Sequence, residues 1–213
     1  MDDLAATFSE AGGWVAELVD DPDTARMWEE PSAVAGMTVG GLAGHLSYGV
    51  ASIDRLLDMP VPSDAPRVEL GAFIASFKME RFDAEIPRYL RDKGERAAKH
   101  GPSQTAGWFR ELLARLASKL AQQPADRLLD MRPVLPWAVR LDDRIRLQVI
   151  EFVVHGDDLA VSLGRDDVEF PERASAVTID ALMAGARAHH GNRAVIRTLA
   201  RNERSTPGVF PVL

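Results

Sequence analysis

Three side chains in this sequence could together bind a metal ion. Glu151 and His155 stand four residues apart, a spacing that places both on one face of an α-helix, one turn from each other. His45 is a distant third candidate. Two histidines and one carboxylate leave open positions on a metal, which is typical of catalytic rather than structural sites. Zinc is the default prediction, with nickel, iron or manganese as alternatives.

The same three residues also have simpler explanations. A single histidine at the edge of an apolar helix face, such as His45, is more often a hydrogen-bonded core residue than a metal ligand. A carboxylate among valines, isoleucines and phenylalanines needs a compensating cation or donor. Arg144 or Arg146 could supply that compensation for Glu151 without any metal.

Two carboxylates follow His155 closely. Asp158 is the candidate for orienting the His155 imidazole, because a carboxylate that holds a ligating histidine in one tautomer is a common companion of metal sites. The alternative is that Asp157 and Asp158 only solvate the helix or pair with Arg165.

Composition narrows the function classes. The chain has 213 residues, a formal charge of -7 and 46% hydrophobic residues, which suit a folded domain but not electrostatic binding to nucleic acid or an anionic membrane. No apolar run approaches the length of a membrane span, so we expect a cytoplasmic protein with small-molecule partners. Cysteine is absent, which excludes a cysteine nucleophile, and any thiol chemistry needs a thiol from outside.

Helical periodicity dominates the chain and predicts an all-α protein. The expected helices span residues 3–21, 39–57, 70–99, 104–123, 142–163, 171–189 and 193–204. We expect a single domain over residues 1–213, in which residues 165–213 form a C-terminal helical extension. A homodimer is left open as the assembly.

Local signals place several boundaries. Thr38 is the predicted N-cap of the helix that carries His45, and Ser103 is a predicted N-cap for the helix after Gly101-Pro102. Pro87 marks a disruption of the stretch from 70 to 99. Two prolines between residues 126 and 139 favour a crossover loop or a short strand there.

Three stretches of the sequence resemble one family. They are Met37–Leu46, Glu151–Ala160 and His190–Arg204, and they are similar to the mycothiol-dependent maleylpyruvate isomerase and DinB-like metalloenzyme superfamily, in particular its short actinobacterial members. The resemblance implies a DinB-like four-helix bundle with additional C-terminal helices. It also implies a divalent metal held by one early histidine and a later Glu-x3-His.

Within this resemblance the metal ligands fall on His45, Glu151 and His155, and a low-molecular-weight thiol, typically mycothiol, is the cosubstrate. Met37 stands where many relatives have tryptophan. Only about fifty residues follow Gly164, where the full isomerases have a separate domain. Maleylpyruvate isomerisation itself is therefore not the expected reaction.

The leading functional prediction is a metal-dependent thiol transferase or isomerase. His45, Glu151 and His155 would hold the metal, Asp158 would orient His155, and Arg146 would bind an anionic group. The metal would activate the thiol for attack on an electrophilic small molecule. The alternatives are a metal-dependent hydrolase and a non-catalytic small-molecule-binding protein on the same fold.

Overall fold

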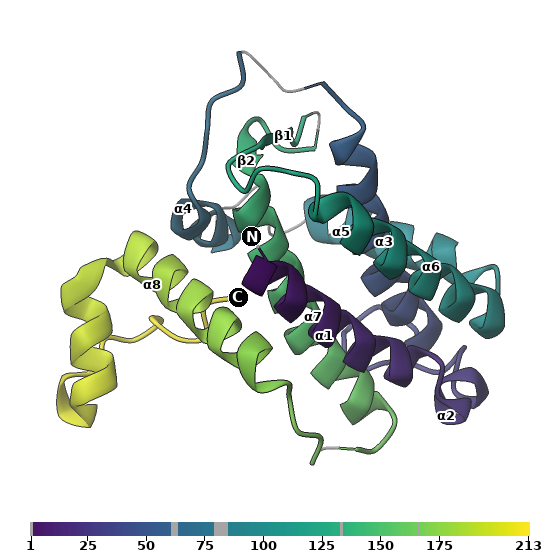
Figure 1. Ribbon diagram of the computed structural model, residues 1–213. Helices are drawn as coiled ribbons and strands as arrows, with labels where there is room; N and C mark the ends of the chain where they lie inside the picture. The colour runs from purple at the N-terminus through teal and green to yellow at the C-terminus, as the bar shows by residue number, and fades with distance from the viewer. Residues whose placement is uncertain (1, 61–63, 79–84, 133, 166) are drawn as a thin grey trace.

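A bundle of four helices forms the framework of the protein. The computed structural model describes residues 2–60, 64–78, 85–132, 134–165 and 167–213. The bundle consists of α1 (Asp2–Val19), α3 (Val39–Leu57), α6 (Pro102–Leu120) and α7 (Leu141–Ser162). α1 and α3 each pack against both α6 and α7 (Figure 1). The predicted all-α, DinB-like fold is confirmed.

Apolar stripes on the helices build the core between them. The predicted stripe on α3 is buried: Leu42, Leu46, Val50, Ile53 and Leu57. On α7, Phe152 is fully buried and its ring lies 5.4 Å from that of Phe8 on α1 and 6.1 Å from that of Phe109 on α6, centroid to centroid. Burial of each such side chain stabilises the fold by about 1.5–3 kcal/mol. α7 is thereby held at the centre of the bundle.

The helix starts show one correct prediction and one wrong one. Thr38 caps α3, since its Oγ1 accepts a hydrogen bond from the Gly41 N–H at 2.8 Å. Ser103 does not cap α6, which begins one residue earlier, at Pro102. There the N-cap is Gly101, at a φ of 82° that favours glycine, and the fixed φ of proline suits the first helical position.

The stretch predicted as one helix from 70 to 99 contains separate elements. α4 (Leu70–Ala75) continues into a 3-10 turn, η1 (Ser76–Lys78), and α5 spans Glu85–Ala98; residues 79–84 lie outside the described part. The disruption predicted at Pro87 is wrong, because Pro87 lies within α5 close to its first described residue.

α5 packs closely along α3. A Cβ added to Gly44 of α3 would lie 2.3 Å from the Gly94 carbonyl oxygen of α5, and one added to Gly94 would lie 3.0 Å from the Cβ of His45. The two backbones can approach this closely only because both positions lack a side chain. The α5 backbone therefore lies directly against the base of His45.

Two short strands connect α6 to α7. β1 (Leu128–Asp130) pairs antiparallel with β2 (Ala138–Arg140), in the region where a loop or short strand was predicted. A small helix, α2 (Pro22–Arg26), follows α1, and Asp21 caps it by accepting from the Asp23 N–H at 2.8 Å. Leu129 of β1 and Val139 of β2 are buried in the same hydrophobic core as the bundle helices.

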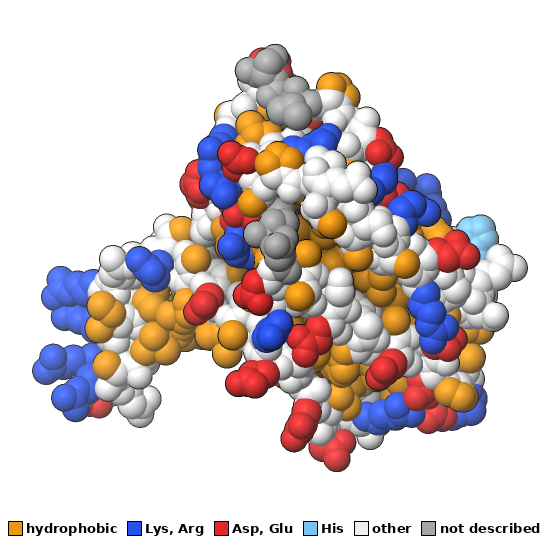
Figure 2. All heavy atoms as spheres, viewed as in Figure 1, with side chains coloured by type: hydrophobic (Ala, Val, Ile, Leu, Met, Phe, Trp, Pro, Cys, Tyr) orange, Lys and Arg blue, Asp and Glu red, His pale blue; other side chains and the backbone are white. Residues whose placement is uncertain are grey.

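The C-terminal part is one long element with a break. α8 (Glu172–Ala200) packs against α4 and α7, and Gly191, at φ 78° and ψ 156°, interrupts it where the sequence predicted a stop. A small apolar cluster of Ala186, Val195 and Val209 joins the chain on either side of Gly191, and η2 (Asn202–Arg204) follows α8. Figure 2 shows basic side chains gathered at the outer edge of this part. The division of the chain at residue 165 stays a prediction.

No helix within the described ranges is long and apolar enough to cross a membrane.

Candidate metal centre

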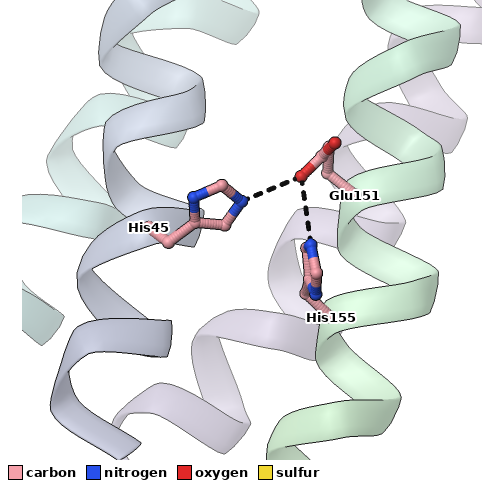
Figure 3. Close-up of side chains that lie close together, drawn as sticks. All are labelled: His45, Glu151 and His155. Carbon is pink, nitrogen blue, oxygen red and sulfur yellow. Dashed lines mark hydrogen bonds and ion pairs between the residues drawn. The ribbon is translucent and has the colours of Figure 1, made fainter. Parts of the chain in front are cut away.

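The fold brings His45, Glu151 and His155 together. His45 projects from α3, while Glu151 and His155 lie one turn apart on α7 and face it (Figure 3). His45 Nε2 lies 3.0 Å from Glu151 Oε2, and His155 Nε2 lies 3.5 Å from the same oxygen. One ligand atom from each residue falls within 4.8 Å of the other two, so the three can hold a metal ion.

The three side chains are shielded to different degrees. The exposed fractions are 12% for His45, 25% for His155 and 36% for Glu151. Burial on its own would raise the pKa of Glu151, but the hydrogen bond with His45 and the charges of His155, His45 and Arg144 lower it to about 2. The carboxylate is therefore ionised at neutral pH, as a metal ligand must be.

Asp158 contacts His155 on the side away from Glu151. His155 Nδ1 and Asp158 Oδ2 lie 2.7 Å apart. Burial favours the neutral ring, but the hydrogen bond to Asp158 and the nearby charges of Glu151 and Asp158 raise the pKa of His155 overall. With Nδ1 donating to Asp158, Nε2 is directed at the triad, where it can bind a metal in the neutral form of the ring.

The donor set fits a divalent cation. Two imidazole nitrogens and one ionised carboxylate oxygen are the ligands of many catalytic zinc and iron sites. In the described chain, His45 Nδ1 is buried without a hydrogen-bond partner, whereas its Nε2 points at Glu151. The three residues are thus a candidate divalent-metal site.

Arg146 is not brought to the triad. Its Nη1 lies 3.3 Å from Asp142 Oδ2 and 3.3 Å from Asp143 Oδ1, on the first turns of α7. It is also absent from the described lining of both cavities at the triad. Arg165, considered above as a partner for Asp157 or Asp158, binds Asp21 instead, at 2.7 Å.

Two cavities border the triad, and both include His45 and Glu151 in their walls. Cavity 1 has a volume of about 400 Å³ and a mostly apolar lining, together with His155 and Arg91: Val34, Met37, Ile74, Phe77, Leu90, Leu147, Ile150, Val154 and Leu213. Cavity 2 has about 510 Å³ and adds polar side chains to its apolar wall: Tyr48, Ser52, Arg55, Tyr89, Arg132, Arg144 and Gln148.

The sequence analysis did not single out Gln148 and considered Arg144 only as a counter-ion for Glu151, whereas both residues line cavity 2. Both residues lie on the face of α7 that carries Glu151, since positions 144, 148, 151 and 155 follow the spacing of one helix face. The same spacing argument that united Glu151 and His155 could have found them.

The fold and the site define a class of protein: a helical bundle with a candidate divalent-metal centre between two of its helices. The chain belongs to the family described as the mycothiol maleylpyruvate isomerase N-terminal domain, which it matches over residues 8–160. The match includes His45, Glu151 and His155 and ends before α8. Comparison with curated proteins and with solved structures yields no match. The predicted family is confirmed, and membership supports a mycothiol-related metalloenzyme.

Proposed function

We propose that this protein is a divalent-metal-dependent thiol transferase or isomerase that uses a low-molecular-weight thiol such as mycothiol. The observation that carries the proposal is the convergence of His45, Glu151 and His155 on one point that borders both cavities. Two cavities at one centre suit two reactants, a thiol and an electrophile. Family membership favours mycothiol as the thiol.

Each residue of the site has a defined part in this proposal. His45, Glu151 and His155 would bind the metal, for which zinc is the first candidate. Asp158 would hold His155 with Nδ1 protonated and Nε2 free to coordinate. When bound, a divalent metal lowers the pKa of a coordinated thiol, so that a thiolate is present near neutral pH.

The apolar side chains around the triad shape the two cavities and exclude water from them. Leu147 and Phe77 line both cavities, and Ile150 and Val154 extend the apolar wall of cavity 1. An apolar wall excludes water, which strengthens electrostatic interactions within the site and limits hydrolysis of a reactive electrophile. The absence of cysteine from the chain agrees with a nucleophile that arrives on the cosubstrate.

Elemental analysis of protein purified without an affinity metal tests the metal site. We expect about one equivalent of divalent metal in the wild type and little in Glu151→Ala. Glu111→Ala, at an exposed position on α6, is the matched control and should retain the metal. A wild type that takes up no metal even after reconstitution would overturn the proposal.

A turnover assay then separates the reaction classes. Metal-loaded protein is incubated with a panel of electrophiles, with and without mycothiol, and the loss of the electrophile and of the thiol are both measured. Turnover that depends on the thiol and is lost in Glu151→Ala supports the proposal. Turnover without thiol would identify a hydrolase, and ligand binding without turnover would identify a binding protein.

A further inference from the structure

Arg144 is a buried cation in the wall of cavity 2. It lies on α7, seven residues before Glu151, and is only 9% exposed. Its guanidinium donates to the Ser52 hydroxyl oxygen at 3.1 Å and to the Gly49 carbonyl and the Gln148 side-chain oxygen at 3.4 Å each. All three acceptors are neutral.

Within the described part of the chain, the charge of Arg144 has no oppositely charged partner in contact. Among the described residues no carboxylate forms an ion pair with it, and Glu151 acts on it only through its field. Burial lowers the pKa of Arg144 to about 10, so the side chain is charged at neutral pH. A metal at the triad would in addition take up the negative charge of Glu151. A buried guanidinium in this state is costly unless an anion compensates it.

Gln148 offers a second donor beside Arg144. Its side chain is fully buried and lines cavity 2. Its Oε1 accepts from Arg144, while its Nε2 has no hydrogen-bond partner within the described ranges. An unsatisfied buried N–H group is unfavourable, and a ligand oxygen that accepts from it would remove that cost. Two donors, one of them charged, therefore border the same cavity on one face of α7.

Part of the wall of cavity 2 is apolar and fits an apolar or aromatic body. Leu56, Phe73, Leu135 and Val134 contribute to its wall, and Arg132, although it also lies there, is already paired with Asp130 at 2.7 Å. Cavity 1 includes neither Arg144 nor Gln148. The two cavities at the triad therefore differ in chemistry.

We propose that cavity 2 binds an organic monoanion, with its carboxylate on Arg144 and Gln148 and its apolar or aromatic body against the surrounding wall. This proposal rests on the proposed function only in making that anion the electrophilic reactant. Cavity 1 is then left for the thiol. Arg144, rather than Arg146, is the residue that selects the anionic reactant.

Binding calorimetry with phenylacetate and its neutral analogue phenylacetamide tests the proposal. The wild type should bind phenylacetate about 10- to 100-fold more tightly, because a charge-assisted hydrogen bond contributes about 1.5–3 kcal/mol. The preference should disappear in Arg144→Met and persist in Arg146→Met, the matched change two residues along the same helix. Equal binding of the two probes by the wild type, or a preference that survives Arg144→Met, would overturn it.

Two further measurements keep the result interpretable. If Arg144→Met does not fold, as judged by circular dichroism, Gln148→Met should still lower phenylacetate affinity severalfold, and unchanged affinity there would contradict the proposal. All titrations are run on metal-stripped and on metal-loaded protein. Metal content is measured separately on the same protein. A missing carboxylate preference with normal metal content would be a failure of this subsite alone, whereas missing metal would be a failure of the proposed metal-dependent function.

Discussion

His155 Nδ1 lies 2.7 Å from Asp158 Oδ2, three residues further along α7. This contact fixes the ring of His155 and directs its other nitrogen to Glu151, 3.5 Å away. Because both partners belong to one helix, the orientation of the ring does not depend on how the helices pack. The His155 half of the candidate metal site is thus organised locally.

Asp158→Asn should weaken metal binding about 10- to 100-fold without removing a ligand, because the amide no longer holds the imidazole as a charged acceptor does. Competition with a chromophoric chelator measures the dissociation constant. Asp157→Asn is the matched control, since the adjacent Asp157 makes no described hydrogen bond to His155. Equal effects of the two changes would show that only the charge of the segment matters.

Zinc added to metal-stripped protein should stabilise the fold through the triad. At one hundred times the dissociation constant the gain is about 2.7 kcal/mol, because the metal binds the folded state. Thermal denaturation over a range of zinc concentrations measures it. His45→Ala should lose most of the gain, whereas His100→Ala, at an exposed position after α5, should keep it. An undiminished stabilisation by zinc in His45→Ala would show that His45 is not a metal ligand.

Gly94→Ala should destabilise the protein by about 1–3 kcal/mol, the usual effect of forcing a methyl group into a closed contact. The new Cβ would lie 2.4 Å from the Gly41 carbonyl oxygen and 3.0 Å from the Cβ of His45. Urea denaturation measures the loss. Gly107→Ala is the control, because Gly107 is exposed on α6 and its Cβ would meet nothing within 4 Å. That change should stabilise the helix by up to about 1 kcal/mol.

Asp54→Asn should lower stability at neutral pH by about 2 kcal/mol, because the carboxylate accepts charge-assisted hydrogen bonds. Asp54 is buried between Arg115, at 2.9 Å, and Lys119, at 2.8 Å. Burial would raise the pKa of Asp54, but these two partners lower it overall.

A lowered pKa in the folded state means that the contribution of Asp54 is complete above the unfolded value and disappears as the pH falls through the folded one. The difference between wild type and Asp54→Asn should therefore narrow below about pH 4. Urea denaturation at several pH values measures it. A difference that is constant down to pH 2 would assign the effect to packing instead.

Local sequence signals predicted the elements that position the site. The cap at Thr38, the buried stripe of α3, the acidic start of α7 and the break at Gly191 depend on residues within a turn or two of each other. The shared helix face of Glu151 and His155 follows from their spacing alone. Ser103 was misplaced as a cap because Gly101 at positive φ and Pro102 at the first helical position together outweigh the capping preference of one serine.

Other features were decided by the tertiary structure. His45 meets Glu151 across 106 residues of sequence, and spacing alone could not show whether this histidine is a core residue or a partner of Glu151. The sequence analysis considered Arg144 and Arg146 alike as counter-ions, although helical spacing places only Arg144 on the face of α7 that carries Glu151. The packing of α7 against the other helices then decides what each arginine contacts: Arg144 lies in the wall of cavity 2, and Arg146 lies against Asp142 and Asp143. Periodicity defines the faces of a helix, but only packing against other helices determines what each face contacts.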